Sequence, residues 1–124
     1  MPISDAESVV MDVLWRSRAP MSAEDVVVAL SASSHWQEAT IKTLLNRLLK
    51  KRAVAAARDG KRYLYSARLK RADYVHGESK SLIDRLFGGR VAPLVAHFSE
   101  AGKLGKKDLA ELKRLIEELD DDRA

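Results

Sequence analysis

The sixteen residues from Trp36 to Lys51 carry two different surfaces at helical spacing, and they constrain the fold more than any other stretch. One face is an apolar stripe that needs a core to pack against: Ile41, Leu44, Leu45, Leu48 and Leu49. The opposite face is polar and cationic, with its shortest side chain at the N-terminal end: Ala39, Lys42, Thr43, Asn46, Arg47 and Lys50. A helix that enters a DNA major groove needs small or hydrogen-bonding residues near the base edges and cations near the phosphates. Taken alone, the segment is equally compatible with a solvated surface helix.

A hairpin signal follows this helix directly. Asp59-Gly60 lies between two strand-like runs, and a tight two-residue turn requires positive φ angles, which Asp and Gly tolerate. Tyr63 and Tyr65 alternate with Leu64, as in a half-buried strand. The expected tip is basic: Arg58, Lys61 and Arg62 surround a single acid. A long helix with a polar face, followed by a basic hairpin, predicts a winged helix-turn-helix whose wing contacts the phosphate backbone.

The positive charge of the chain is concentrated rather than spread evenly. Of the 22 Lys and Arg residues, 11 lie within residues 35–71, where the acids are Glu38 and Asp59 alone. From Glu100 onward, acids outnumber bases. This distribution predicts a localised contact with a polyanion. Nucleic acid fits better than a membrane surface, because the core needs the apolar stripe that a membrane would otherwise bind.

Two shorter helices are predicted before the cationic one. Ser4-Asp5-Ala6-Glu7 and Ser22-Ala23-Glu24-Asp25 have the pattern of capping boxes, which begin helices. The apolar stripes that follow are Ala6, Val9, Val10, Val13 and Leu14 in the first helix and Ala23, Val26, Val27 and Leu30 in the second. Three helices and a hairpin predict a mainly α fold with a small β wing, and a winged-helix DNA-binding domain over residues 1–69.

Residues 70–124 predict a second, helical domain. Apolar periodicity indicates three helices, over residues 70–87, 91–98 and 109–119. Helices this short cannot bury their apolar side chains within one copy, so we expect a homodimer. The expected dimerisation residues are Tyr74, Leu82, Leu86, Phe87, Leu94, Phe98, Leu109, Leu112, Ile116 and Leu119. The alternative is that these helices pack back on the N-terminal domain as a single globule.

The residue types also exclude several functions. The chain has no cysteine, so disulfides and thiolate metal sites are excluded. His35, His76 and His97 have no partner at metal-ligand spacing. A glycine-rich phosphate loop, a nucleophile elbow and a carboxylate cluster are all missing. We therefore expect no enzyme activity, no metal and no cofactor. Without a secretory signal or an apolar run long enough to span a bilayer, the expected location is cytoplasmic, with no membrane insertion.

The chain resembles the penicillinase-repressor (BlaI/MecI) family nearly end to end. The segments that carry the resemblance, in order, are ISDAE, VMDVLW, HWQEATIKTLLNRLLKKRAV, RYLYSA, LIDRLFGG and LVAHFSEAGKLGKKDLAELKRLIEEL. The resemblance implies a dimeric winged-helix repressor bound to an inverted-repeat operator in double-stranded DNA. It implies control of β-lactam resistance or cell-envelope stress genes, and release when a membrane-bound metalloprotease sensor leads to cleavage in the C-terminal region.

The cleaved bond of the best-known family members, between Asn and Phe, falls here on His97 and Phe98. The Phe is present and the Asn is not. The copper-responsive branch of the family uses cysteine ligands, which this chain lacks, so copper sensing by that chemistry is excluded.

The expected DNA-binding residues divide by their chemistry. The candidates for base-edge contact are Glu38, Ala39, Thr40, Lys42, Thr43 and Asn46. Lysine can donate to guanine O6 and N7, asparagine pairs with adenine, and a threonine methyl can contact the thymine methyl. The candidates for phosphate contact are Arg47, Lys50 and Lys51, with Arg58, Lys61 and Arg62 in the wing.

Three other functions share parts of this pattern. A regulator released by direct binding of a small-molecule effector would need an apolar pocket between the domains. An RNA-binding module would need exposed aromatic residues for stacking, which are lacking here. A function as a protein-interaction module would not explain the basic surface.

Overall fold

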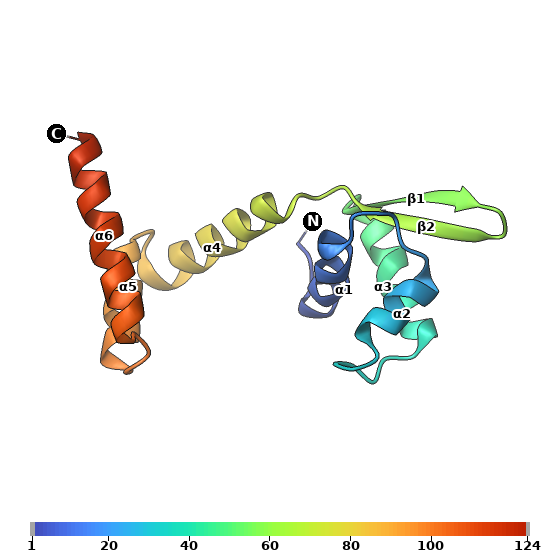
Figure 1. Ribbon diagram of the computed structural model, residues 1–124, viewed down its shortest axis with the longest axis horizontal. Coiled ribbons are helices and arrows are strands. Elements are labelled where there is room, and N and C mark those ends of the chain that lie inside the picture. Colours follow the sequence, from blue (N-terminus) through green and yellow to red (C-terminus); the bar gives the residue numbers. More distant parts are fainter. Residues whose placement is uncertain (1, 124) are drawn as a thin grey trace. The chain divides into compact units, whose positions relative to one another are not determined.

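The computed structural model describes residues 2–123, which form helices and one β-hairpin (Figure 1). Contacts divide the chain into two compact units, Met1–Val75 and His76–Ala124. The first unit holds α1 to α3 and the hairpin, and the second holds most of α4 together with α5 and α6.

The first unit is a winged helix-turn-helix, as the sequence predicts. Its elements are α1 (Asp5–Arg16), α2 (Ala23–Leu30), α3 (Glu38–Lys50), β1 (Val54–Asp59) and β2 (Arg62–Ala67). The three helices pack on one another, and the two antiparallel strands pack against them. The fully buried side chains that join the helices include Val10, Met11, Val26, Ile41, Leu45 and Leu48. The apolar stripes of all three helices therefore meet in one core.

The predicted capping boxes are confirmed at α1 and α2. The Ser4 hydroxyl accepts a hydrogen bond from the backbone N–H of Glu7 (3.1 Å), whose carboxylate accepts one from the Ser4 N–H (2.9 Å). Ser22 and Asp25 repeat this arrangement at the start of α2, at 3.1 and 3.0 Å. Each box satisfies N–H groups that a helix otherwise leaves unpaired, and so fixes where the helix begins.

The hairpin forms as predicted, but its turn lies one residue further along the chain. Asp59 is paired with Arg62, so the two turn residues are Gly60 and Lys61 rather than Asp59 and Gly60. Of these two, only Gly60 has a positive φ (+65°). A glycine at the first central position suits a two-residue hairpin turn, and Asp59 can then stay in the strand.

The chain between α1 and α2 is fixed to the wing. The backbone N–H of Met21 donates to the Tyr65 carbonyl (2.9 Å), and the Tyr65 N–H donates to the Met21 carbonyl (2.7 Å). Tyr65 itself is buried in the core. This pairing holds the wing and the beginning of α2 in one rigid unit.

The start of α4 belongs to the first unit. The Tyr74 ring lies 5.4 Å from the Trp15 ring, and the Trp15 indole N–H donates to the carbonyl of Leu69 (2.8 Å). The sequence expectation for Tyr74 was a dimer contact. In one copy its ring packs on α1 of the same chain, and a dimer contact at Tyr74 stays a prediction.

The second unit is built from α4 (Arg71–Phe87), α5 (Val91–Glu100) and α6 (Lys106–Arg123). Gly88 and Gly89 both have positive φ angles (59° and 81°) and separate α4 from α5. None of the described residues of α4 and α5 is fully buried. Large apolar side chains stay exposed on this unit, including Leu86, Leu115, Ile116 and Leu119. These described apolar side chains therefore remain open to solvent in one copy.

An apolar groove runs between α5 and α6. Its volume is about 280 Å³, and it is lined mainly by Leu94, Val95, Phe98, Leu104, Leu112 and Leu115. Among the helices that the structure describes, none is both long enough and apolar enough to cross a lipid bilayer.

Candidate nucleic-acid interface

The two faces of α3 separate as the sequence predicts. Ile41, Leu44, Leu45 and Leu48 are buried against the other helices, and Leu49 is partly buried. Every expected DNA-contact residue on the opposite face is exposed: Glu38, Ala39, Thr40, Lys42, Thr43, Asn46, Arg47 and Lys50. The core therefore fixes the rotation of α3 so that its polar, cationic face is presented to solvent.

The exposed Thr43 side chain uses its hydroxyl proton within α3. The Thr43 hydroxyl donates to the Ala39 carbonyl one turn earlier (3.0 Å). A hydroxyl that donates back to its own helix has no proton left to donate to a base. The side chain therefore suits contact with a thymine methyl.

The first turns of α3 carry a charge pair. The Lys42 ammonium lies 3.2 Å from a Glu38 carboxylate oxygen, and both side chains are about half exposed (55% and 46%). The hydrogen bond and the charge of Glu38, together with the charge of Glu24, raise the pKa of Lys42 above its usual value. A bond from its own backbone N–H is the main cause that lowers the pKa of Glu24, and the charge of Lys42 adds a smaller lowering. The lysine is thus positive and both acids are close to it.

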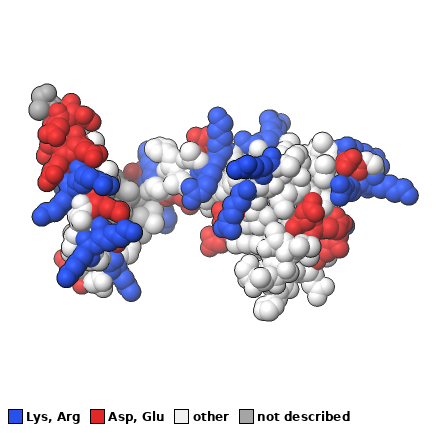
Figure 2. All heavy atoms as spheres, in the orientation of Figure 1, with Lys and Arg blue, Asp and Glu red and all other residues white. Residues whose placement is uncertain are grey.

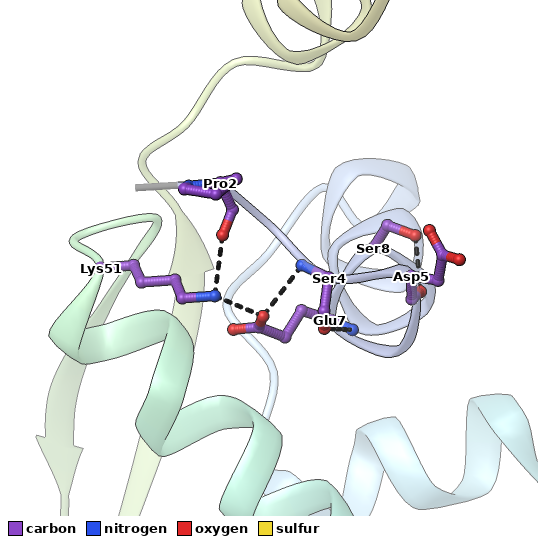
Figure 3. A network of polar contacts seen from close by, with 6 residues as sticks. All are labelled: Pro2, Ser4, Asp5, Glu7, Ser8 and Lys51. Atoms are coloured by element: carbon purple, nitrogen blue, oxygen red, sulfur yellow. Dashed lines mark hydrogen bonds and ion pairs between the residues drawn. The ribbon is translucent and has the colours of Figure 1, made fainter.

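Lys51 has a different role from the one the sequence suggests. Its ammonium binds the Glu7 carboxylate (2.5 Å) and the Pro2 carbonyl (2.8 Å), as Figure 3 shows. The Glu7 side chain is 2% exposed and that of Lys51 only 20%. Burial raises the pKa of Glu7, but bonds from Lys51 and Ser4 and the charge of Lys51 outweigh burial and leave it lowered. Lys51 therefore joins the end of α3 to the start of α1, and we correct its assignment from phosphate contact to structural ion pair.

The cations of the wing lie near its tip. The Arg62 guanidinium lies 3.3 Å from the Asp59 carboxylate, and the Arg58 guanidinium stacks 5.7 Å from the centre of the Tyr63 ring. Arg58 also donates to the Gly60 carbonyl (3.4 Å). Figure 2 shows Lys and Arg atoms gathered at the far end of the wing, with Asp and Glu on the neighbouring surface of the same unit. These weak local contacts orient the arginines and leave their charge exposed.

One hollow connects the three parts of this surface. It has a volume of about 150 Å³ and is lined by Ala23, Glu24, Lys42, Lys61, Arg62, Tyr63 and Tyr65. The residues come from the start of α2, the exposed face of α3 and the wing. The sequence indicated each element separately, but it did not indicate that Glu24 lies beside Lys42 or that Tyr63 supports Arg58. The strand alternation of Tyr63 was the one available signal for the second contact.

The described part of the chain offers no other obvious chemistry. Residues 2–123 contain no group of three or more His, Asp or Glu side chains that could hold a metal ion. The interface described above combines the cations of α3 and of the wing with exposed polar side chains of α3.

The model of one protein family, described as penicillinase repressor, matches residues 3–118. The chain belongs to the penicillinase repressor family. It is thus a DNA-binding transcriptional repressor of the BlaI/MecI type and not an enzyme.

Its relatives match over most of their length. A penicillinase repressor of Bacillus licheniformis is 34% identical over 116 residues, which cover 94% of this chain and 90% of the relative. The methicillin resistance regulatory protein MecI of Staphylococcus aureus (strain N315) is 29% identical over 114 residues, 92% of each chain. The family assignment therefore extends to the C-terminal helices.

Two solved structures match the winged unit. The solution structure of the DNA-binding domain of the repressor BlaI has a TM-score of 0.53 and 38% identity, covering 58% of this chain and 87% of that one. The Bacillus licheniformis BlaI monomeric form, in complex with the blaP half-operator, has a TM-score of 0.51 and 36% identity, covering 60% and 89%.

Proposed function

We propose that this repressor binds an inverted-repeat operator as a homodimer, with α3 of each copy in a major groove. The observation that carries the proposal is the exposed cationic face of α3, held beside a basic wing by the core on its opposite side. The BlaI relative supports it, because the monomeric form of that protein is in complex with a half-operator. From the names of the relatives we infer that the regulated genes serve β-lactam resistance or cell-envelope stress.

The proposed DNA contacts of α3 differ between its first turns and its last turn. Residues of its first turns, Ala39, Thr40 and Thr43, are short enough to approach base edges, and Asn46 can pair with adenine. Arg47 and Lys50 in the last turn bind phosphates, together with the wing cations Arg58, Lys61 and Arg62.

The second unit provides the interface of the proposed dimer. Its exposed apolar residues on α6, Leu109, Ile116 and Leu119, are about half exposed in one copy (47%, 57% and 56%). Contact with a second copy would remove this surface from water, which stabilises association by about 25 cal/mol per Å² of apolar area buried. The remaining residues of the proposed interface are Tyr74, Leu82, Leu86, Phe87, Leu94, Phe98 and Leu112.

Inactivation is proposed to follow proteolysis between His97 and Phe98, by a system that includes a membrane-bound metalloprotease sensor. Both residues lie inside α5, where the His97 ring packs 5.2 Å from the Phe98 ring and 6.3 Å from that of Phe87. A protease needs an extended substrate, so this bond becomes available when α5 opens locally. Cleavage there would remove α6 and part of the apolar groove.

Operator affinity is expected to depend steeply on salt. If the dimer neutralises about 6–10 phosphates, affinity falls by about 10³–10⁵ between 50 and 200 mM salt, because bound cations release counterions from DNA. Fluorescence anisotropy across this range measures the slope. Replacing Lys61 by Met should make the slope shallower, whereas a flat dependence in the unaltered protein would contradict a phosphate-binding surface.

Selection of duplexes from a randomised pool tests the proposal as a whole. The full chain is expected to enrich a two-fold symmetric sequence, with half-sites about one helical turn apart or slightly more. Enrichment of an asymmetric site, or of no site, would contradict it.

A further inference from the structure

The Glu38–Lys42 pair is unusual on a surface that binds DNA. Its atoms lie 3.2 Å apart near the start of α3, and both side chains are about half exposed. Exposed ion pairs contribute little to stability. The pair is therefore important mainly for the hydrogen-bond donor and acceptor that it exposes on the surface of the repressor.

A carboxylate in this place works against simple phosphate binding. Glu38 repels phosphates, and Glu24 at the start of α2 adds a second negative charge near Lys42. A face that served only to neutralise phosphates would carry cations without acids. As the acid in the first turn of α3, Glu38 also stabilises the N-terminus of the helix. Its half-exposed carboxylate can in addition accept a hydrogen bond, and DNA presents donor groups on its base edges.

The edge of a G·C base pair has the matching arrangement. In the major groove, guanine presents the acceptors O6 and N7, and cytosine presents the donor N4. O6 and N4 are joined by a base-pairing hydrogen bond, so they lie about 2.9 Å apart. The Lys42 donor and the Glu38 acceptor, at 3.2 Å, have a similar separation and the opposite polarity.

We propose that Glu38 and Lys42 act as one specificity-determining pair that reads a single G·C base pair in each half-site. Lys42 donates to guanine O6 and N7, and Glu38 accepts from cytosine N4. The inference rests on the proposed function, because it requires α3 to lie in the major groove.

The pair also reads the orientation of the base pair. A reversed C·G pair places the cytosine amino group against the Lys42 ammonium and the guanine oxygen against the Glu38 carboxylate, so both contacts become repulsive. A T·A pair keeps the order of acceptor and donor, but thymine lacks the second acceptor that guanine N7 supplies. The expected order of preference is therefore G·C, then T·A, then the two reversed pairs.

Reversing single base pairs in the selected operator tests the proposal. For the unaltered protein, reversing one particular G·C pair in a half-site should weaken binding by about 5- to 150-fold. In Glu38→Gln the Glu38 part of this penalty should disappear, because an amide can both accept from cytosine and donate to guanine, whereas the Lys42 part remains. Lys42→Met should lose affinity for the G·C operator and show a smaller orientation preference, since only the Glu38 contact remains.

Glu24→Gln is the matched control. It removes a negative charge from the same cluster but lies on α2, outside the proposed pair. It should strengthen binding to all duplexes alike and leave the ranking of base pairs unchanged. Thermal unfolding confirms that each variant is folded.

The outcomes separate the two proposals. If the unaltered protein enriches no duplex, the proposed function fails. If it enriches a symmetric operator but Glu38→Gln keeps the full reversal penalty at every position, the pair does not read a base and this inference alone is overturned. A loss of base ranking in Glu24→Gln equal to that in Glu38→Gln would overturn it as well, since general electrostatics would then explain both.

Discussion

A chain that ends at His97 is expected to bind a two-half-site operator about 10²–10⁴-fold more weakly than the full chain, because avidity is lost when the two winged units are no longer joined. The truncation removes α6 and Phe98, and with them most of the lining of the groove between α5 and α6. Anisotropy at fixed salt measures the affinity, and sedimentation measures whether the shortened chain is a monomer.

A full-length variant with Ile116→Ser and Leu119→Ser is the control for this prediction. Both side chains are exposed in one copy, so the substitutions should weaken association without unfolding the helix. The variant should resemble the truncated chain in both measurements. If the truncated chain stayed dimeric and bound the operator as tightly as the full chain, α6 would have no part in the dimer.

Replacing Lys51 by Met is expected to lower the free energy of unfolding by about 3 kcal/mol, near the lower end for removing one partner of a buried ion pair. The substitution leaves the Glu7 carboxylate buried without its cation. It also removes the bond that holds the Pro2 carbonyl, visible in Figure 3. Denaturant unfolding at a fixed protein concentration measures the change, because the stability of a dimer depends on concentration.

The dependence of stability on pH provides the control for the ion pair. The folded state lowers the pKa of Glu7, so its contribution is fully present above the pKa of the unfolded chain and is lost as the pH falls through the folded pKa. In Lys51→Met the loss of stability at low pH should be smaller. The charged Glu7 carboxylate then has no ion pair with Lys51 that protonation could remove. The double variant Glu7→Gln, Lys51→Met should recover part of the stability. A Lys51→Met protein as stable as the original would show that the contact contributes nothing.

Local patterns predicted the elements of the winged unit well. The capping boxes at Ser4 and Ser22 and the apolar stripe of α3 depend on residues a few positions apart, and the structure confirms them. The turn was displaced by one residue because Asp59 tolerates either a strand or a turn, so its position depends on strand pairing.

Contacts between distant parts of the chain could not be predicted in the same way. Lys51 follows the cationic face of α3 in the sequence, but it turns toward Glu7, 44 residues away. Tyr74 fits an apolar pattern in α4 and yet packs on Trp15. Glu24 and Lys42 line the same hollow because the turn between α2 and α3 brings the two helices together. Each of these depends on how the helices pack, which periodicity alone does not specify.

The most direct test of a dimer that reads two half-sites is to compare the affinity of the full chain for two duplexes of equal length at the same salt. One duplex carries the complete inverted repeat, and the other carries one half-site with the second scrambled. The complete repeat should bind about 10²–10⁴-fold more tightly, because the second contact is made within one complex. Equal affinity for the two duplexes would contradict the account.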